Sequence, residues 1–134
     1  MLSITVGKMK FRARLEVDRA PRTCDALRAL LPLRAGLLQA RWSGQAAWVP
    51  FGDRVLDLPP ENATSYPAIG ELLLYPGGVS EMELLFPYGP TCFASKAGQL
   101  AGNHFATIVE GLEQLEELGR LVLWKGEQPL CIDA

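Results

Sequence analysis

The chain has few of the residues that build covalently linked or metal-held scaffolds. Its three cysteines, Cys24, Cys92 and Cys131, are odd in number and far apart, and no C-x-x-C pair occurs among its 134 residues. This spacing argues against a disulfide framework and against a structural zinc site. A single histidine, His104, offers too little for a metal centre, which needs several converging ligands. We therefore expect reduced thiols, no metal and no cofactor.

Long apolar runs and an excess of one charge are also missing. No stretch approaches the roughly 18 consecutive apolar residues of a membrane span, and the N-terminal residues lack the apolar core of a signal peptide. Thirteen lysine and arginine residues are scattered among fifteen aspartate and glutamate residues, so no basic face forms for a phosphate backbone. These features predict a cytoplasmic protein that has neither a nucleic acid nor a membrane as its partner.

What the chain does contain is a regular alternation of apolar and polar residues. The length and the 49% apolar content fit a single domain over residues 1–134 with one packed core. Residues 9–17 alternate without error, which predicts a strand with one solvent-exposed face. Further strands are expected at residues 4–6, 36–42, 46–51, 71–75, 82–86, 120–124 and 128–132. Two helices are expected, one capped by Thr23 that ends near Leu31, and an amphipathic one between Asn103 and Gly119.

Eight mostly antiparallel strands around one small core are best arranged as a closed barrel, because closure removes exposed strand edges. We therefore predict a mainly β fold, a closed eight-stranded barrel with two helices capping its ends. Side chains fill the interior of a barrel of this size, so a binding site must lie at a rim or on an outer face. The proline-rich residues 52–69 are predicted to form a long surface loop that serves as a wall of such a site.

Several short motifs, in this order along the chain, resemble bacterial cyclophilin-like proteins of unknown function. They are residues 41–44 (Arg-Trp-Ser-Gly) with 47–48 (Ala-Trp), 70–78 (Gly-Glu-Leu-Leu-Leu-Tyr-Pro-Gly-Gly), 102–105 (Gly-Asn-His-Phe) and 108–112 (Ile-Val-Glu-Gly-Leu). The resemblance covers nearly the whole chain and implies a cyclophilin-like eight-stranded barrel, but no established activity. In cyclophilins proper, an arginine on a barrel strand serves prolyl isomerisation, and Arg41 is the position that would carry this role. The Phe-His-Arg and Phe-Met-x-Gln segments of true cyclophilins are absent.

The predicted site centres on His104 and Arg41. Asn103 is a good helix N-cap, which places His104 in a first helical turn, where the ring stays neutral and free backbone N–H groups hold an anion. Arg41 lies on the predicted strand 36–42 beside Trp42 and needs a carboxylate partner if it points inward. We expect both to face one pocket at the barrel rim that binds a small polar or anionic molecule. The predicted ligand-binding residues are Arg41, Trp42, Glu61, Asn62, Tyr75 and His104.

The residues leave several alternatives open. His104 can instead fix the entry of its helix by bonding to loop backbone, or form a thiolate pair with Cys92. The whole chain can instead be a weak peptidyl-prolyl cis-trans isomerase, or a structural module that forms homo-oligomers through its aromatic surface. No feature of the sequence selects a ligand, a reaction or an oligomeric state.

Overall fold

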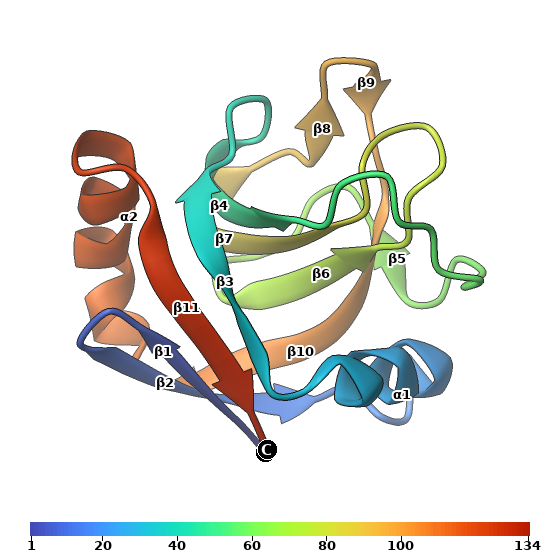
Figure 1. Cartoon of the computed structure of the whole chain (residues 1–134), viewed down its shortest axis with the longest axis horizontal. Helices are drawn as coiled ribbons and strands as arrows, with labels where there is room; N and C mark the ends of the chain where they lie inside the picture. The colour runs from blue at the N-terminus through green and yellow to red at the C-terminus, as the bar shows by residue number, and fades with distance from the viewer.

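Eight strands of five or more residues form a closed antiparallel barrel in the computed structural model, which describes all 134 residues (Figure 1). These strands are β1 (Leu2–Val6), β2 (Met9–Leu15), β3 (Leu33–Gln39), β4 (Gly44–Pro50), β6 (Glu71–Tyr75), β7 (Glu83–Thr91), β10 (Gly102–Glu110) and β11 (Gln128–Asp133). Their order around the barrel is β2-β1-β11-β3-β4-β7-β6-β10, and β10 pairs with β2 to close the ring. The predicted fold class is confirmed.

Short elements complete the fold. They are α1 (Pro21–Leu30), the 3-10 helix η1 (Leu112–Gln114), α2 (Leu115–Trp124) and the two-residue strands β5 (Ala63–Thr64), β8 (Ala94–Ser95) and β9 (Gly98–Gln99). β5 pairs with the start of β10, while β8 and β9 form a separate hairpin above the barrel in Figure 1. Neither helix has the length and apolar character that crossing a bilayer requires.

The main core fills the barrel interior. In β2 the side chains of Met9, Phe11 and Ala13 are buried and the residues between them are exposed, as the alternation predicts. Phe11 meets Phe86 of β7 edge to face, with the ring centroids 5.8 Å apart. The two helices lie on opposite sides of the barrel in Figure 1, and each contributes buried residues to this core.

A second, smaller apolar cluster lies on the outer face of the barrel. Strand alternation produces it, because Leu84 and Phe86 belong to the interior core whereas Leu85, between them, belongs to the outer cluster. The members of this outer cluster are Ala40, Ala46, Leu73, Tyr75, Leu85, Phe93 and Leu100, with Trp48 packed against them. Residues 92–100, which include the β8–β9 hairpin, supply two of these side chains and so cover this part of the sheet.

The second predicted helix is misplaced. Residues 102–110 form β10, so Asn103 is not a helix N-cap and His104 does not lie in a helical turn. The register of β10 shifts twice, between His104 and Ala106 against β6 and between Ile108 and Glu110 against β2. Such bulges reset strand alternation, and the resulting burial repeats about every three residues, which imitates the period of a helix.

Other boundaries also differ from the prediction. The true second helix, α2, extends to Trp124 and occupies residues 120–124, where a strand was expected. Thr23 is not a cap, because α1 begins at Pro21 and Thr23 is buried inside the helix. β7 continues to Thr91, well past the predicted end at residue 86, and the long loop of residues 52–69 is confirmed apart from β5.

Candidate functional site

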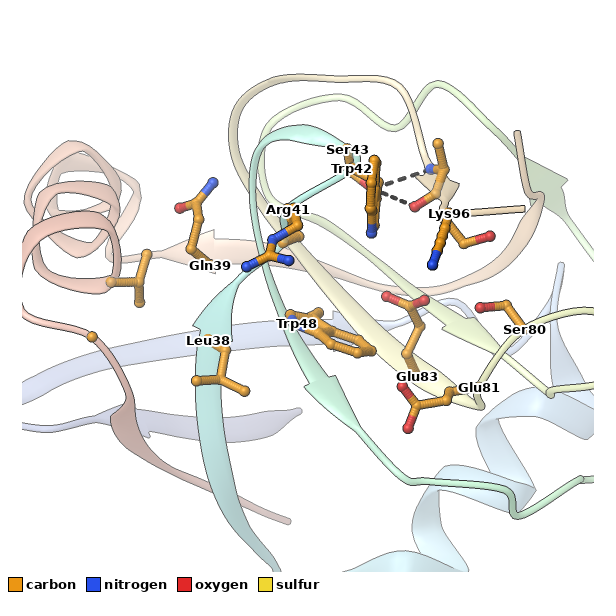
Figure 2. A pocket seen from close by; sticks show the side chains of 15 residues that line it. Leu38, Gln39, Arg41, Trp42, Ser43, Trp48, Ser80, Glu81, Glu83 and Lys96 are labelled. Carbon is orange, nitrogen blue, oxygen red and sulfur yellow. Dashed lines mark hydrogen bonds between the residues drawn. The ribbon is translucent and has the colours of Figure 1, made fainter. Parts of the chain in front are cut away.

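A cavity of about 530 Å³ opens on the outer face of the barrel, beside the outer cluster (Figure 2). It is bounded by β3 and β4 with the turn between them, by the start of β7 and the loop before it, by the β8–β9 hairpin, and by the end of α2. The side chains that give it chemical character are Arg41, Trp42, Ser43, Trp48, Ser80, Glu81, Glu83 and Lys96. Its volume is within the range of small-molecule sites in proteins.

Ser43 fixes one wall of this cavity. The side chain is buried, and its hydroxyl donates to the carbonyl oxygen of Ala94 and accepts from the backbone N–H of the same residue, both at 3.1 Å. Figure 2 draws these two hydrogen bonds as dashed lines. They join the β3–β4 turn, which contains Arg41 and Trp42, to the β8–β9 hairpin, which contains Lys96.

Two tryptophans provide planar apolar surface. Trp48 is half-buried on β4, where it packs against the outer cluster, while Trp42 is 53% exposed in the turn before β4. An exposed tryptophan beside a cavity is available to contact a ligand, because its ring is not used in the packing of the protein. The site therefore has one fixed aromatic surface and one open to solvent.

Glu83 is the most unusual group in the cavity. It is only 5% exposed, and neither a hydrogen bond nor an ion pair reaches its carboxyl group from the protein. Burial, and to a smaller extent the charge of Glu81, raises the pKa of Glu83 from 4.5 to about 8. Every fully enclosed side-chain oxygen or nitrogen has a hydrogen-bond partner, so the unpartnered Glu83 oxygens must touch the open space of the cavity.

The elements beside Glu83 explain why it has no partner. In the sheet it lies between Pro50 of β4 and Tyr75 of β6. The Tyr75 hydroxyl instead accepts from the backbone N–H groups of Val79 and Ser80. At neutral pH Glu83 therefore keeps its proton, which is typical of carboxyl groups in functional sites.

Residues 2–132 match the family model described as "Protein of unknown function (DUF3830)". The chain belongs to the DUF3830 family. Comparison of this DUF3830 chain with curated proteins found no match. Among solved structures, that of McbB in complex with tryptophan is similar, with a TM-score of 0.76 and 17% sequence identity over 99% of the DUF3830 chain and 44% of the McbB chain.

At this identity the likeness to McbB is one of fold alone, and the DUF3830 chain spans less than half of McbB. The matches support the β-barrel part of the resemblance inferred from the sequence. Its cyclophilin-like and bacterial parts stay predictions, since neither match bears on them.

Of the predicted site residues, the DUF3830 cavity brings together Arg41 and Trp42 only. Glu61, Asn62, Tyr75 and His104 are not among its lining residues, so Arg41 and His104 do not share this cavity. The cavity also lies on the outer face of the sheet rather than at a barrel rim. The expectation of a common rim pocket depended on a helix at His104, and β10 takes the place of that helix.

Glu61 and Asn62 belong to a partly buried structural network. The Glu61 carboxylate accepts from the backbone N–H and the hydroxyl of Thr23, both at 2.8 Å, which ties the long loop to α1. Asn103 makes three hydrogen bonds, accepting from the Glu61 N–H and donating to the Thr23 hydroxyl and the Pro59 carbonyl. Asn62, with a left-handed φ of 52°, donates to the carbonyl oxygen of His104. These groups satisfy one another rather than a ligand.

His104 takes part in a separate network on the outer face of β10. Its Nε2 lies 2.8 Å from the Thr107 hydroxyl, which donates to the Glu16 carboxylate at 2.7 Å. Because that hydroxyl has one proton and gives it to Glu16, Nε2 must carry a proton and donate to Thr107. Nδ1 lies 3.7 Å from the Glu71 carboxylate. The bond from Thr107 lowers the pKa of Glu16, in spite of an opposing effect of burial and with help from Arg14.

Cys92 is an exposed free thiol, and the hydrogen bond of the His104 ring goes to Thr107 rather than to a cysteine. No three histidine, cysteine, aspartate or glutamate side chains form a metal-binding group.

The residue that sequence analysis missed is Glu83. The sequence does contain a sign of it, because Glu83 is the one charged residue inside the otherwise apolar run 82–86, which was predicted to be a strand. A charged residue in such a run needs either a partner inside the protein or access to an opening. Glu83 is buried without a partner and lines the cavity.

Proposed function

We propose that this protein binds a small polar molecule with a planar apolar part in the cavity beside Glu83. The planar part lies against Trp48 and Trp42, and its polar groups reach Glu83 inside the cavity and Arg41 or Lys96 at its mouth. Arg41 and Lys96 are suited to a carboxylate, as the sequence predicts for a polar or anionic ligand.

The observation that carries this proposal is the buried Glu83 carboxyl without a protein partner. A buried polar group with no hydrogen bond costs about 1–3 kcal/mol, and a ligand that supplies the bond offsets this cost. Proteins keep such destabilising groups mainly where they serve a function. The McbB structure adds support, since that protein, with a barrel of similar fold, is in complex with tryptophan. An aromatic amino acid has the planar part and the polar groups that this cavity suits.

The affinity expected for such a ligand is modest. A molecule of roughly a dozen non-hydrogen atoms that gains about 0.3–0.6 kcal/mol per atom binds with a Kd between about 2 mM and about 5 µM. The cavity has an open mouth with exposed Arg41, Trp42 and Lys96, so the tighter end of this range needs contact with Glu83.

Isothermal titration calorimetry with a panel of aromatic amino acids, amines, carboxylates and nucleosides tests the proposal. We expect at least one class to bind in the stated range, and Trp48→Leu to weaken its binding at least about five-fold, because a stacked ring contributes about 1 kcal/mol. Trp124→Leu is the matched control, since Trp124 is 77% exposed on α2 and does not line the cavity. Failure of every class to bind at millimolar concentration, or equal affinities for the two variants, would contradict the proposal.

A further inference from the structure

We propose that the cavity selects molecules that carry a protonated amine, and that their binding releases the proton of Glu83 to solvent. This inference rests on the proposed function, and it adds the charge of the ligand and a linked proton. It follows from the position of Glu83 relative to the other charged groups of the cavity.

Glu83 is the only charged side chain inside the cavity that is almost fully buried. Figure 2 shows its two oxygens turned towards the side on which Trp42 and Lys96 lie. Arg41, Glu81 and Lys96 are all exposed, so they lie in solvent at the mouth. A ligand that enters between the tryptophans therefore meets Arg41, Lys96 and the acid Glu81 near the surface, and the Glu83 carboxyl group below them.

Three of the segments that bound the cavity bring charged groups near Glu83. Arg41 belongs to the β3–β4 turn, Glu81 to the loop before β7, and Lys96 to the β8–β9 hairpin. β6 adjoins Glu83 through Tyr75. The Tyr75 hydroxyl accepts hydrogen bonds from two backbone N–H groups and makes none to Glu83. The residues of β4 and α2 that line the cavity, Trp48 and Val122, have no charge. Burial is the main cause that keeps Glu83 protonated, and Glu81, the one charged group that adds to it, also opposes ionisation.

An ammonium group supplies the positive charge and the hydrogen-bond donors that Glu83 does not receive from the protein. A neutral ligand meets Glu83 as a carboxylic acid, which has one proton to donate. A protonated amine brings a positive charge and up to three donors into a poorly solvated space, where an opposite charge favours the ionised carboxylate. The reaction is Glu83–COOH plus R–NH₃⁺ giving the ion pair Glu83–COO⁻···⁺H₃N–R plus one proton in water. The amine keeps its own proton, and no covalent bond changes except the O–H bond of Glu83.

This exchange gives binding a characteristic dependence on pH. Because the pKa of the free Glu83 is about 8, an amine that binds below that pH must displace a proton, and its affinity rises by up to ten-fold per pH unit towards pH 8. Above the pKa of the amine, near 10, the affinity falls again. A neutral or anionic analogue lacks this rise, since it does not favour the ionised carboxylate.

Calorimetry with three indoles tests the inference: tryptamine as the amine, indole as the neutral parent and indole-3-acetate as the anion. At about pH 6, titrations in two buffers of different ionisation enthalpy measure the protons released. We expect close to one proton for tryptamine and none for indole. Tryptamine is expected to bind at least ten-fold more tightly than indole at about pH 8.

Glu83→Gln keeps the size of the side chain but cannot ionise. In this variant we expect the proton release to disappear and tryptamine to lose its advantage, while indole binds as before. Glu81→Gln is the matched control, because it removes an exposed acid of the same cavity and should retain the proton release. The buffer comparison on the unaltered protein decides the question even if a variant fails to fold.

The outcomes separate the two proposals. If none of the three indoles and none of the wider panel binds, the proposed function itself is wrong. If indole or indole-3-acetate binds as tightly as tryptamine, or if tryptamine binds without releasing a proton, the cavity is a binding site but the inference about amines is wrong. Proton release that persists in Glu83→Gln also overturns the inference, because another group must then supply the proton.

Discussion

Replacement of Glu83 by Gln should stabilise the protein, by an amount that grows with pH. The pKa of Glu83 lies near 8 in the folded protein and near 4.5 as an ordinary carboxyl. Between these values the folded protein holds a proton that the unfolded chain has lost, so stability falls by about 1.4 kcal/mol for each pH unit of increase. The stability that this bound proton contributes is fully present below about pH 4.5, and ~5 kcal/mol of it is lost by about pH 8.

A glutamine at this position is neutral at every pH and avoids that loss. Relative to the unaltered protein, Glu83→Gln should gain less than about 1 kcal/mol at pH 5, about 3 kcal/mol at pH 7 and about 5 kcal/mol at pH 9. Urea unfolding followed by circular dichroism at these three pH values measures the difference. Glu81→Gln, at an exposed acid two residues away, should keep most of the pH dependence. Stability curves that run parallel for the Glu83→Gln variant and the unaltered protein would refute the account of a buried, protonated carboxyl.

Three further substitutions test the networks around the barrel. Asn103→Ala removes one buried and two partly buried hydrogen bonds and should lower the free energy of unfolding by about 3 kcal/mol in a urea titration, and a loss below about 1 kcal/mol would show that these bonds contribute little. Gly119→Ala should destabilise by about 1–3 kcal/mol although alanine favours helices, because a Cβ there would overlap the Tyr88 ring; increased thermal stability would contradict this packing. His104→Ala should cost about 1 kcal/mol in stability and leave tryptamine affinity unchanged, since the ring bonds to Thr107 outside the cavity. A change in tryptamine affinity would show that His104 takes part in binding.

Sequence patterns predicted the strands that follow the simplest rule. β2 alternates between buried and exposed side chains along its whole length, and β6 occupies the predicted residues 71–75, because neither strand contains a bulge. β10 was misread because two bulges shift its alternation. The expected number of eight strands is correct only because two errors cancel: β10 was missed, and residues 120–124 of α2 were counted instead.

Only two of the predicted site residues line the cavity, because the others were chosen from local sequence patterns. Arg41 and Trp42 could be found because an arginine beside a tryptophan on a predicted strand is conspicuous in the sequence, although both residues lie in the turn after β3. The unpartnered state of Glu83 depends on its neighbours across the sheet, Pro50 of β4 and Tyr75 of β6, and single-sequence patterns do not encode such pairings. His104 was overvalued because it was assigned to a helix N-terminus that does not exist.

The place of β11 in the barrel has a consequence for how the chain acquires its fold. β11 lies between β1 and β3, so that Ser3 pairs with Asp133 and Leu33 pairs with Ile132. Until the last of these residues leaves the ribosome, β1 and β3 each present an unpaired edge, for a period on the order of ten seconds at ordinary rates of synthesis. Such edges are templates for association between nascent chains. The barrel can thus close only after synthesis of β11, and the yield of folded protein in cells should depend on protection of these two edges during translation.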